Sequence, residues 1–248
     1  MVDHFVGARM RIESAKRHLR TVAAEQVRFF NSSFQWRQEL RGGLWLTFIK
    51  QMDPMPQEIE LSAWDAIQNL RSSLDLAVCA AAMSRGATTL KHTYFHFASD
   101  ESEWERSLKG RTRAATPETI AIMRAYKPWG GGNEPLYALS RLSAIERHQL
   151  VAPKLLANNS IILNGCDALF TGPGSIGIGR HDWDVERGEL IITETRYPID
   201  IPIPGYQFTT FIAFGDTPFV GREQFIPIVN SLCDLCTEIV NAIERGAP

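Results

Sequence analysis

Hydrophobic residues recur at helical spacing over three long stretches of the chain, residues 3–30, 57–85 and 223–245. In each stretch the apolar positions fall three or four residues apart, which predicts an amphipathic helix with one apolar face. Asp3 is a suitable N-cap for the first helix and Gly86 is a suitable stop for the second. Because none of these faces can be buried alone, we expect the three helices to pack against one another, with a sheet at one side.

Strand-like patterns interrupt the helical ones. Residues 34–40 and 44–51 are expected to form a β-hairpin, because aromatic and β-branched residues lie on both sides of the turn at residues 41–43. Residues 88–97 are expected to be extended and to lead into a loop rich in Ser, Asp and Glu. From residue 158 onward, short β-like runs are separated by Gly, Pro and Asn, which predicts an antiparallel β-rich segment.

Two shorter helices are predicted between the second and third long helices. One begins after Thr116, which with Pro117 gives an N-cap and a first-turn proline, and ends at Tyr126. The other is expected to run without a break from Glu134 to about Val151. The order of helices, then strands, then a helix predicts an α+β fold.

We expect this fold to form a single domain over residues 1–248. Its helical part would cover about residues 1–155, its β-rich part about 156–222 and its closing helix about 223–246. The closing helix has a wide apolar face, and the first two helices are its natural partners. The predicted architecture is therefore a bundle of long amphipathic helices with an N-terminal hairpin and a C-terminal antiparallel β-rich segment.

Composition narrows the class of protein. The formal net charge is −2, so no overall positive field attracts nucleic acid, and such a contact would need a local basic patch. No apolar run approaches the roughly 18 residues of a membrane span, and the first twenty residues are charged throughout. The chain has four cysteines, Cys79, Cys166, Cys233 and Cys236, and three of the four lie in apolar helical patterns. We therefore expect a soluble, cytoplasmic protein with no membrane partner and no disulfide.

Arg141 and His148 are the candidate catalytic residues. Seven residues make nearly two helical turns, so on one continuous helix the two side chains would lie within about 20° of each other around the axis. Histidine can transfer protons near neutral pH, and arginine can grip phosphate oxygens and stabilise developing charge. Together they could cleave a phosphodiester without a metal ion. The alternative is a solvated helix face with no chemistry.

Arg71, Asp75 and Asn133 are the candidate ligand-binding residues. Asn133 ends the glycine-rich run at residues 129–133, which could cradle an anion at the start of a helix. The run lacks the lysine and the preceding strand of a P-loop, so a capped connection is the alternative. Arg71 and Asp75 are one helical turn apart. They would form either a surface ion pair or a pair that holds His148 or the glycine run in place.

No metal site and no cofactor are predicted. His92, His96 and the run at residues 181–184 contain metal-binding side chains, but no spacing predicts the convergence of three or four ligands. The pair Cys233 and Cys236 lacks a second pair and lies in a predicted helix.

Two resemblances add to this picture. The spacing of Arg141 and His148 resembles the HEPN superfamily of bacterial nucleases and nucleotide-binding proteins. That resemblance implies metal-independent RNA cleavage by a paired Arg and His in a homodimer. The chain also resembles a family of uncharacterised bacterial proteins, at residues 69–75, 126–129 and 147–148. This second resemblance supports the predicted domain and implies no mechanism.

Two functions therefore remain open. The first is a binding or scaffold module that holds a small ligand or a protein partner through its β-rich half, around Trp183, Tyr197, Tyr206 and Phe208. The second is a HEPN-like endoribonuclease that acts on RNA through Arg141, His148 and a second copy of the chain. We favour the binding module, because nothing in the sequence assembles a complete active site.

Overall fold

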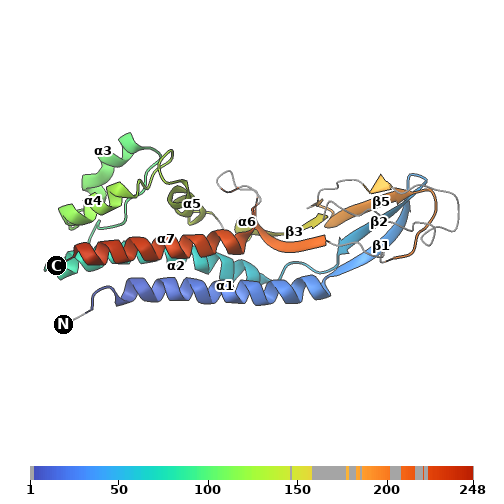
Figure 1. The fold of residues 1–248 in the computed structure, drawn as a ribbon, viewed down its shortest axis with the longest axis horizontal. Coiled ribbons are helices and arrows are strands. Elements are labelled where there is room, and N and C mark those ends of the chain that lie inside the picture. The colour runs from blue at the N-terminus through green and yellow to red at the C-terminus, as the bar shows by residue number, and fades with distance from the viewer. Residues whose placement is uncertain are drawn as a thin grey trace. The chain divides into compact units, whose positions relative to one another are not determined.

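The computed structural model describes residues 3–145, 147–157, 177–178, 183–184, 186–201, 208–215, 220 and 223–247. Its elements follow the order α1 (Val6–Ser32), β1 (Phe34–Arg41), β2 (Leu44–Gln51), α2 (Gln57–Ser84), α3 (Glu101–Arg111), α4 (Pro117–Ala125), α5 (Glu134–Leu142), α6 (Arg147–Leu150), β3 (Val151–Ala157), β4 (Gly177–Ile178), β5 (Glu189–Thr195), β6 (Phe208–Phe214) and α7 (Phe225–Gly246) (Figure 1). Long helices and antiparallel strands occupy different stretches of the chain, so the predicted α+β class is confirmed.

Contacts within the chain form two compact units. One contains Met1–Ala24, Gln57–Val151 and Phe214–Pro248, and the other contains Glu25–Pro56 and Ala152–Ala213. The N-terminal hairpin thus belongs to the same unit as most of the strand-rich stretch. The expectation of a single domain over residues 1–248 stays a prediction.

The core of the first unit is the expected helical bundle. α2 packs along α7, and Figure 1 shows α1, α2 and α7 side by side. From α1, Arg9 donates to Glu244 of α7 at 2.8 Å, and Arg11 donates to Asn69 of α2 at 3.1 Å. The buried apolar residues of the three helices include Ala8, Ile12, Leu19, Ile67, Leu70, Leu74, Val229, Leu232 and Ile239. By length and composition, α7 is also apolar enough to cross a membrane, a property that it shares with core helices of globular proteins.

Several helix ends lie where the sequence places a cap. Gly86 follows α2 with φ +86°, and the amides of Gly86 and Ala87 donate to Met83 and Ala82. This is the Schellman arrangement, in which a left-handed glycine satisfies the last carbonyls of a helix. At α4 the hydroxyl of Thr116 accepts from the Thr119 amide at 3.1 Å, as expected of an N-cap.

The predicted helix from Glu134 to about Val151 is interrupted, so that prediction is wrong. α5 ends at Leu142, and the amides just beyond it donate three residues back, from Ala144 to Arg141 and from Ile145 to Leu142. The carbonyl of Ser143 then accepts from the side chain of Gln68 on α2 at 2.7 Å. A side chain from another helix therefore satisfies a carbonyl at the C-terminus of α5. The periodic pattern of the sequence does not predict this contact.

A second correction concerns the loop expected after residue 97, which contains α3. Asp100 caps this helix by accepting from the Glu103 amide at 2.8 Å. Trp104 and Leu108, one turn apart, are its buried residues. The sequence D-x-x-E followed by apolar residues four apart was therefore a helix signal that outweighs the polar composition of the stretch.

The second unit is built on a four-stranded sheet in the order β1-β2-β5-β4, and β3 pairs with β6. The predicted hairpin is confirmed: β1 pairs with β2 around Gly42 and Gly43, which have φ of +60° and +85°. Two positive φ values are typical of a type I′ turn. One face of the sheet packs into a core formed by Ile49, Trp183, Leu190, Ile192 and Ile199.

Candidate functional site

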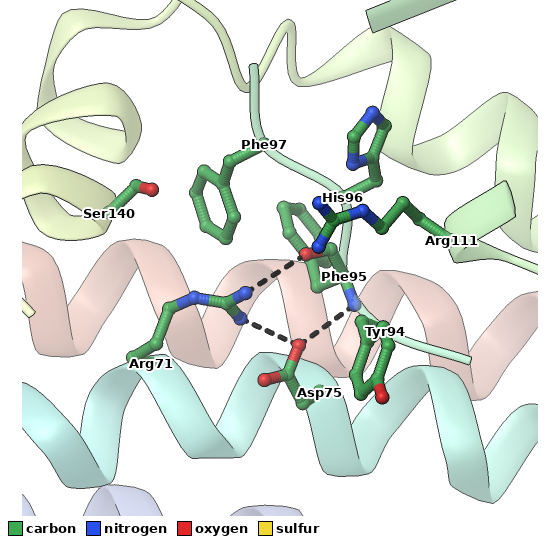
Figure 2. A pocket seen from close by; sticks show the side chains of 8 residues that line it. All are labelled: Arg71, Asp75, Tyr94, Phe95, His96, Phe97, Arg111 and Ser140. Carbon is green, nitrogen blue, oxygen red and sulfur yellow. Dashed lines mark hydrogen bonds and ion pairs between the residues drawn. The ribbon is translucent and has the colours of Figure 1, made fainter. Parts of the chain in front are cut away.

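A cavity of about 400 Å³ lies in the first unit. Figure 2 shows the eight residues that line it: Arg71 and Asp75 from α2, Tyr94, Phe95, His96 and Phe97 from the segment before α3, Arg111 from the end of α3, and Ser140 from α5. This volume falls within the range of small-molecule sites. Of the predicted ligand-binding residues, Arg71 and Asp75 line this cavity and Asn133 does not.

The Arg71–Asp75 pair clamps the backbone of Phe95. Arg71 donates to the Asp75 carboxylate at 2.6 Å and to the Phe95 carbonyl at 3.3 Å, while Asp75 accepts from the Phe95 amide at 2.9 Å (Figure 2). The Arg71 guanidinium also lies 4.4 Å from the centre of the Phe97 ring. The ion pair therefore satisfies both backbone groups of a buried residue that lies in no strand. Its described contacts are with residues 95 and 97, rather than with the glycine run.

Burial and pairing act on Asp75 in opposite directions. Burial raises the pKa of the Asp75 carboxyl, and the charge and hydrogen bond of Arg71, together with the Phe95 amide, lower it in part. The net direction is upward. This carboxylate is therefore held in the cavity wall against its desolvation cost by one cation and one amide.

Arg111, an exposed residue at the end of α3, brings a second cation to the mouth of the cavity. In Figure 2 its side chain extends toward Phe95 from the side opposite to Arg71. Among the described residues, none forms a hydrogen bond or ion pair with its guanidinium, whereas the charge of Arg71 is matched by Asp75. Burial lowers the pKa of His96, and the positive charge of Arg111 acts in the same direction. With His96 neutral, the lining has one positive charge in excess.

The predicted catalytic pair is placed differently from the expectation. Arg141 lies exposed near the end of α5, and this residue does interact with another part of the protein. His148 belongs to α6, and its side chain lies outside the described part of the chain. Because the helix is broken between them, the argument that both side chains share one helix face does not hold. Their role in catalysis stays a prediction.

The glycine run around Asn133 is a tightly packed connection. A Cβ on Gly130 would lie 2.6 Å from the Ser99 carbonyl oxygen, and one on Gly132 would lie 2.6 Å from that of Lys127. The side chain of Asn133 accepts from the Leu136 amide at 3.2 Å and caps α5, as predicted. These contacts give structural reasons for the glycines. A ligand-binding role for Asn133 stays a prediction.

The expected aromatic patch of the β-rich half is only partly described. Trp183 is 7% exposed and belongs to the core of the second unit, so it does not lie in an exposed apolar patch. Binding through the β-rich half stays a prediction. Tyr197 is exposed. Tyr206 lies outside the described residues, as does the side chain of Phe208.

Metal-binding side chains do not cluster in the part of the chain that the structure describes. No group of three or more His, Cys, Asp or Glu residues there could hold a metal ion. Cys79, Cys233 and Cys236 are free thiols, and burial raises the pKa of each. Cys166, His181 and Asp182 fall outside the described residues.

Sequence reasoning missed five of the lining residues: Tyr94, Phe95, Phe97, Arg111 and Ser140. The signal for α3 was present, and it would have placed Arg111 on a helix, but nothing local indicates that this helix ends beside α2. Comparisons with protein-family models, curated proteins and solved structures find no match to this chain.

Proposed function

We propose that this protein is a binding module for a small anionic molecule, which it holds in the cavity beside Arg111. The observation that carries this proposal is a guanidinium on the cavity wall with no acidic partner among the described residues. Arginine binds carboxylate and phosphate groups through a planar fork of N–H donors, and an unmatched charge in a partly enclosed site favours an anion.

The rest of the lining supports a ligand with a flat apolar part. Tyr94 and Phe97 offer aromatic surfaces on two sides of the Phe95 backbone (Figure 2). Arg71 is already held by Asp75, Phe95 and Phe97, so it shapes the wall while Arg111 is available to the ligand. A carboxylate or phosphate carried on an aromatic ring fits this combination of charge and surface.

Calorimetric titration with benzoate and with phenyl phosphate tests the proposal. We expect at least one probe to bind the wild-type chain and to bind Arg111→Gln at least about 10-fold more weakly, as for a lost charged hydrogen bond. Arg113→Gln is the matched control, because Arg113 is an exposed arginine like Arg111, lies two residues away and does not line the cavity. Absence of binding by both probes, or equal losses in the two variants, would refute the proposal.

A further inference from the structure

The cavity wall contains a histidine whose tautomer is set by its neighbours. The Ser107 hydroxyl lies 2.6 Å from the Glu103 carbonyl oxygen, one turn earlier in α3. A carbonyl can only accept and a hydroxyl has one proton, so Ser107 donates to Glu103. The same hydroxyl oxygen lies 2.8 Å from Nε2 of His96. With its proton committed, this oxygen can only accept, and Nε2 must carry a proton.

The ring is also fixed in orientation. It stacks on the buried Trp104 ring with centroids 5.8 Å apart, and the Trp104 indole donates to the His96 carbonyl at 2.9 Å. Burial and the charge of Arg111 lower the pKa of His96, and a hydrogen bond with the Trp104 backbone opposes them in part, so the net direction favours the neutral ring. A neutral imidazole with a proton on Nε2 has a free lone pair on Nδ1.

That lone pair faces the proposed ligand. Figure 2 shows one ring nitrogen of His96 on the side of Phe97 and Arg111, and the other directed away from them. Among the described residues, no donor is hydrogen-bonded to Nδ1. An acceptor at the wall of a partly enclosed cavity discriminates between ligands, because leaving it unpaired in a complex is unfavourable.

We infer that the ligand carries an O–H or N–H donor in addition to its anionic group, and that His96 Nδ1 accepts from it while Arg111 binds the anion. This inference rests on the proposed anion site. It narrows the ligand class to hydroxy- or amino-substituted aromatic acids and to phosphates that retain a proton. His96 acts here in selecting the ligand and transfers no proton.

Two measurements on the full chain test the inference. Long-range nitrogen–proton NMR at pH 7, with the His96 signal assigned from His96→Phe, should show the Nε2–H tautomer, and Ser107→Ala should weaken that preference. Calorimetry with the hydroxybenzoate isomers and the matching methoxybenzoates should find one isomer that binds about 10-fold more tightly than its methoxy counterpart. His96→Phe should reduce that ratio to about one.

The outcomes distinguish the anion site at Arg111 from the role of His96 in selecting the ligand. If hydroxy and methoxy compounds bind equally and both need Arg111, the anion site stands and the role of His96 is wrong. An Nδ1–H tautomer or a charged ring in the free protein would also overturn it. If no compound binds the wild-type chain, the anion site itself fails and this inference fails with it.

Discussion

Among the described residues of the second unit, Glu189 should be the charged residue whose replacement lowers stability most. Its carboxylate accepts from Arg41 at 2.8 and 3.1 Å and from Lys50 at 3.1 Å, and its side chain is 7% exposed. Lys50 lies opposite Glu189 in the pairing of β2 with β5, and Arg41 comes from β1. One carboxylate thus joins three strands, and Glu189→Gln would leave two cations together without it.

The size of the effect follows from the pKa of Glu189. The hydrogen bond from Arg41 acts most strongly and, with Lys50, lowers this pKa from 4.5 to about 2, although burial opposes the change. At about 1.4 kcal/mol per pKa unit, the lowering corresponds to at most about 3.5 kcal/mol of stability. Arg41 and Lys50 are 27% and 33% exposed, so water screens part of the interaction. We therefore expect Glu189→Gln to lower the free energy of unfolding by about 2 kcal/mol at pH 7.

The pH dependence has a defined sign. The folded-state pKa lies below the unfolded one, so the stabilisation is complete above about pH 4.5 and is lost as the pH falls toward 2. Urea denaturation at pH 7 and pH 3, with amide hydrogen exchange in β2 and β5 as the local readout, measures both effects. Glu39→Gln is the control, because Glu39 also pairs with Arg41 but is 55% exposed and should contribute below about 0.5 kcal/mol. The reasoning is wrong if Glu189→Gln matches this control at pH 7, or if its deficit is as large at pH 3 as at pH 7.

Three further predictions concern the first unit. Asp75→Asn should lower stability by about 1–2 kcal/mol because Arg71 loses its counter-ion, yet it should tighten benzoate binding by adding positive charge to the cavity; unchanged stability together with weaker binding would contradict this. Asn133→Ala should lower stability by about 1 kcal/mol in thermal unfolding through loss of the α5 cap, and a smaller loss of benzoate affinity than in Arg111→Gln is expected. For the ribonuclease hypothesis, His148→Ala and Arg141→Ala should each reduce RNA cleavage in EDTA by about 100-fold or more, and activity that survives both would remove these residues from the mechanism.

The fold could be predicted from sequence where the cause is local. The caps at Thr116 and Asn133, the stop at Gly86 and the turn at Gly42 depend on residues within a few positions, and all four form as expected. The helix predicted from Glu134 to about Val151 is instead interrupted, at a point where Gln68, 75 positions away in the chain, donates to the Ser143 carbonyl. A periodic pattern reports which face is apolar, and it carries no information about side chains that arrive from another helix.

The candidate site shows even more clearly that local relations can be predicted from sequence and that contacts between distant residues cannot. Arg71 and Asp75 were recognisable as a pair one turn apart, because that relation is a property of α2 alone. Their partner Phe95 lies 20 residues beyond Asp75, and its side chain is neither charged nor polar, so nothing in the sequence indicates that it belongs to the site. Recognition here is through the Phe95 backbone, which every residue possesses, so no sequence pattern could have identified it.

This reliance on backbone recognition links the stability of the first unit to its proposed function. Residues 94–97 belong to no strand; isolated bridges at Thr93 and Ala98 bound them, and between these the ion pair holds Phe95. This segment of the cavity wall is therefore positioned by the charged pair, by the Tyr94 amide, which donates to the Arg111 carbonyl, and by the Trp104 indole, which donates to the His96 carbonyl. Residues 94–97 take no part in a regular ladder of sheet hydrogen bonds. An anion bound at Arg111 would place negative charge in the same cavity as Asp75, so ligand affinity and the strength of the clamp should be coupled. Asp75→Asn removes a negative charge that would repel the anion, and it also weakens the clamp on Phe95. We therefore expect ligand affinity to rise and stability to fall in this variant.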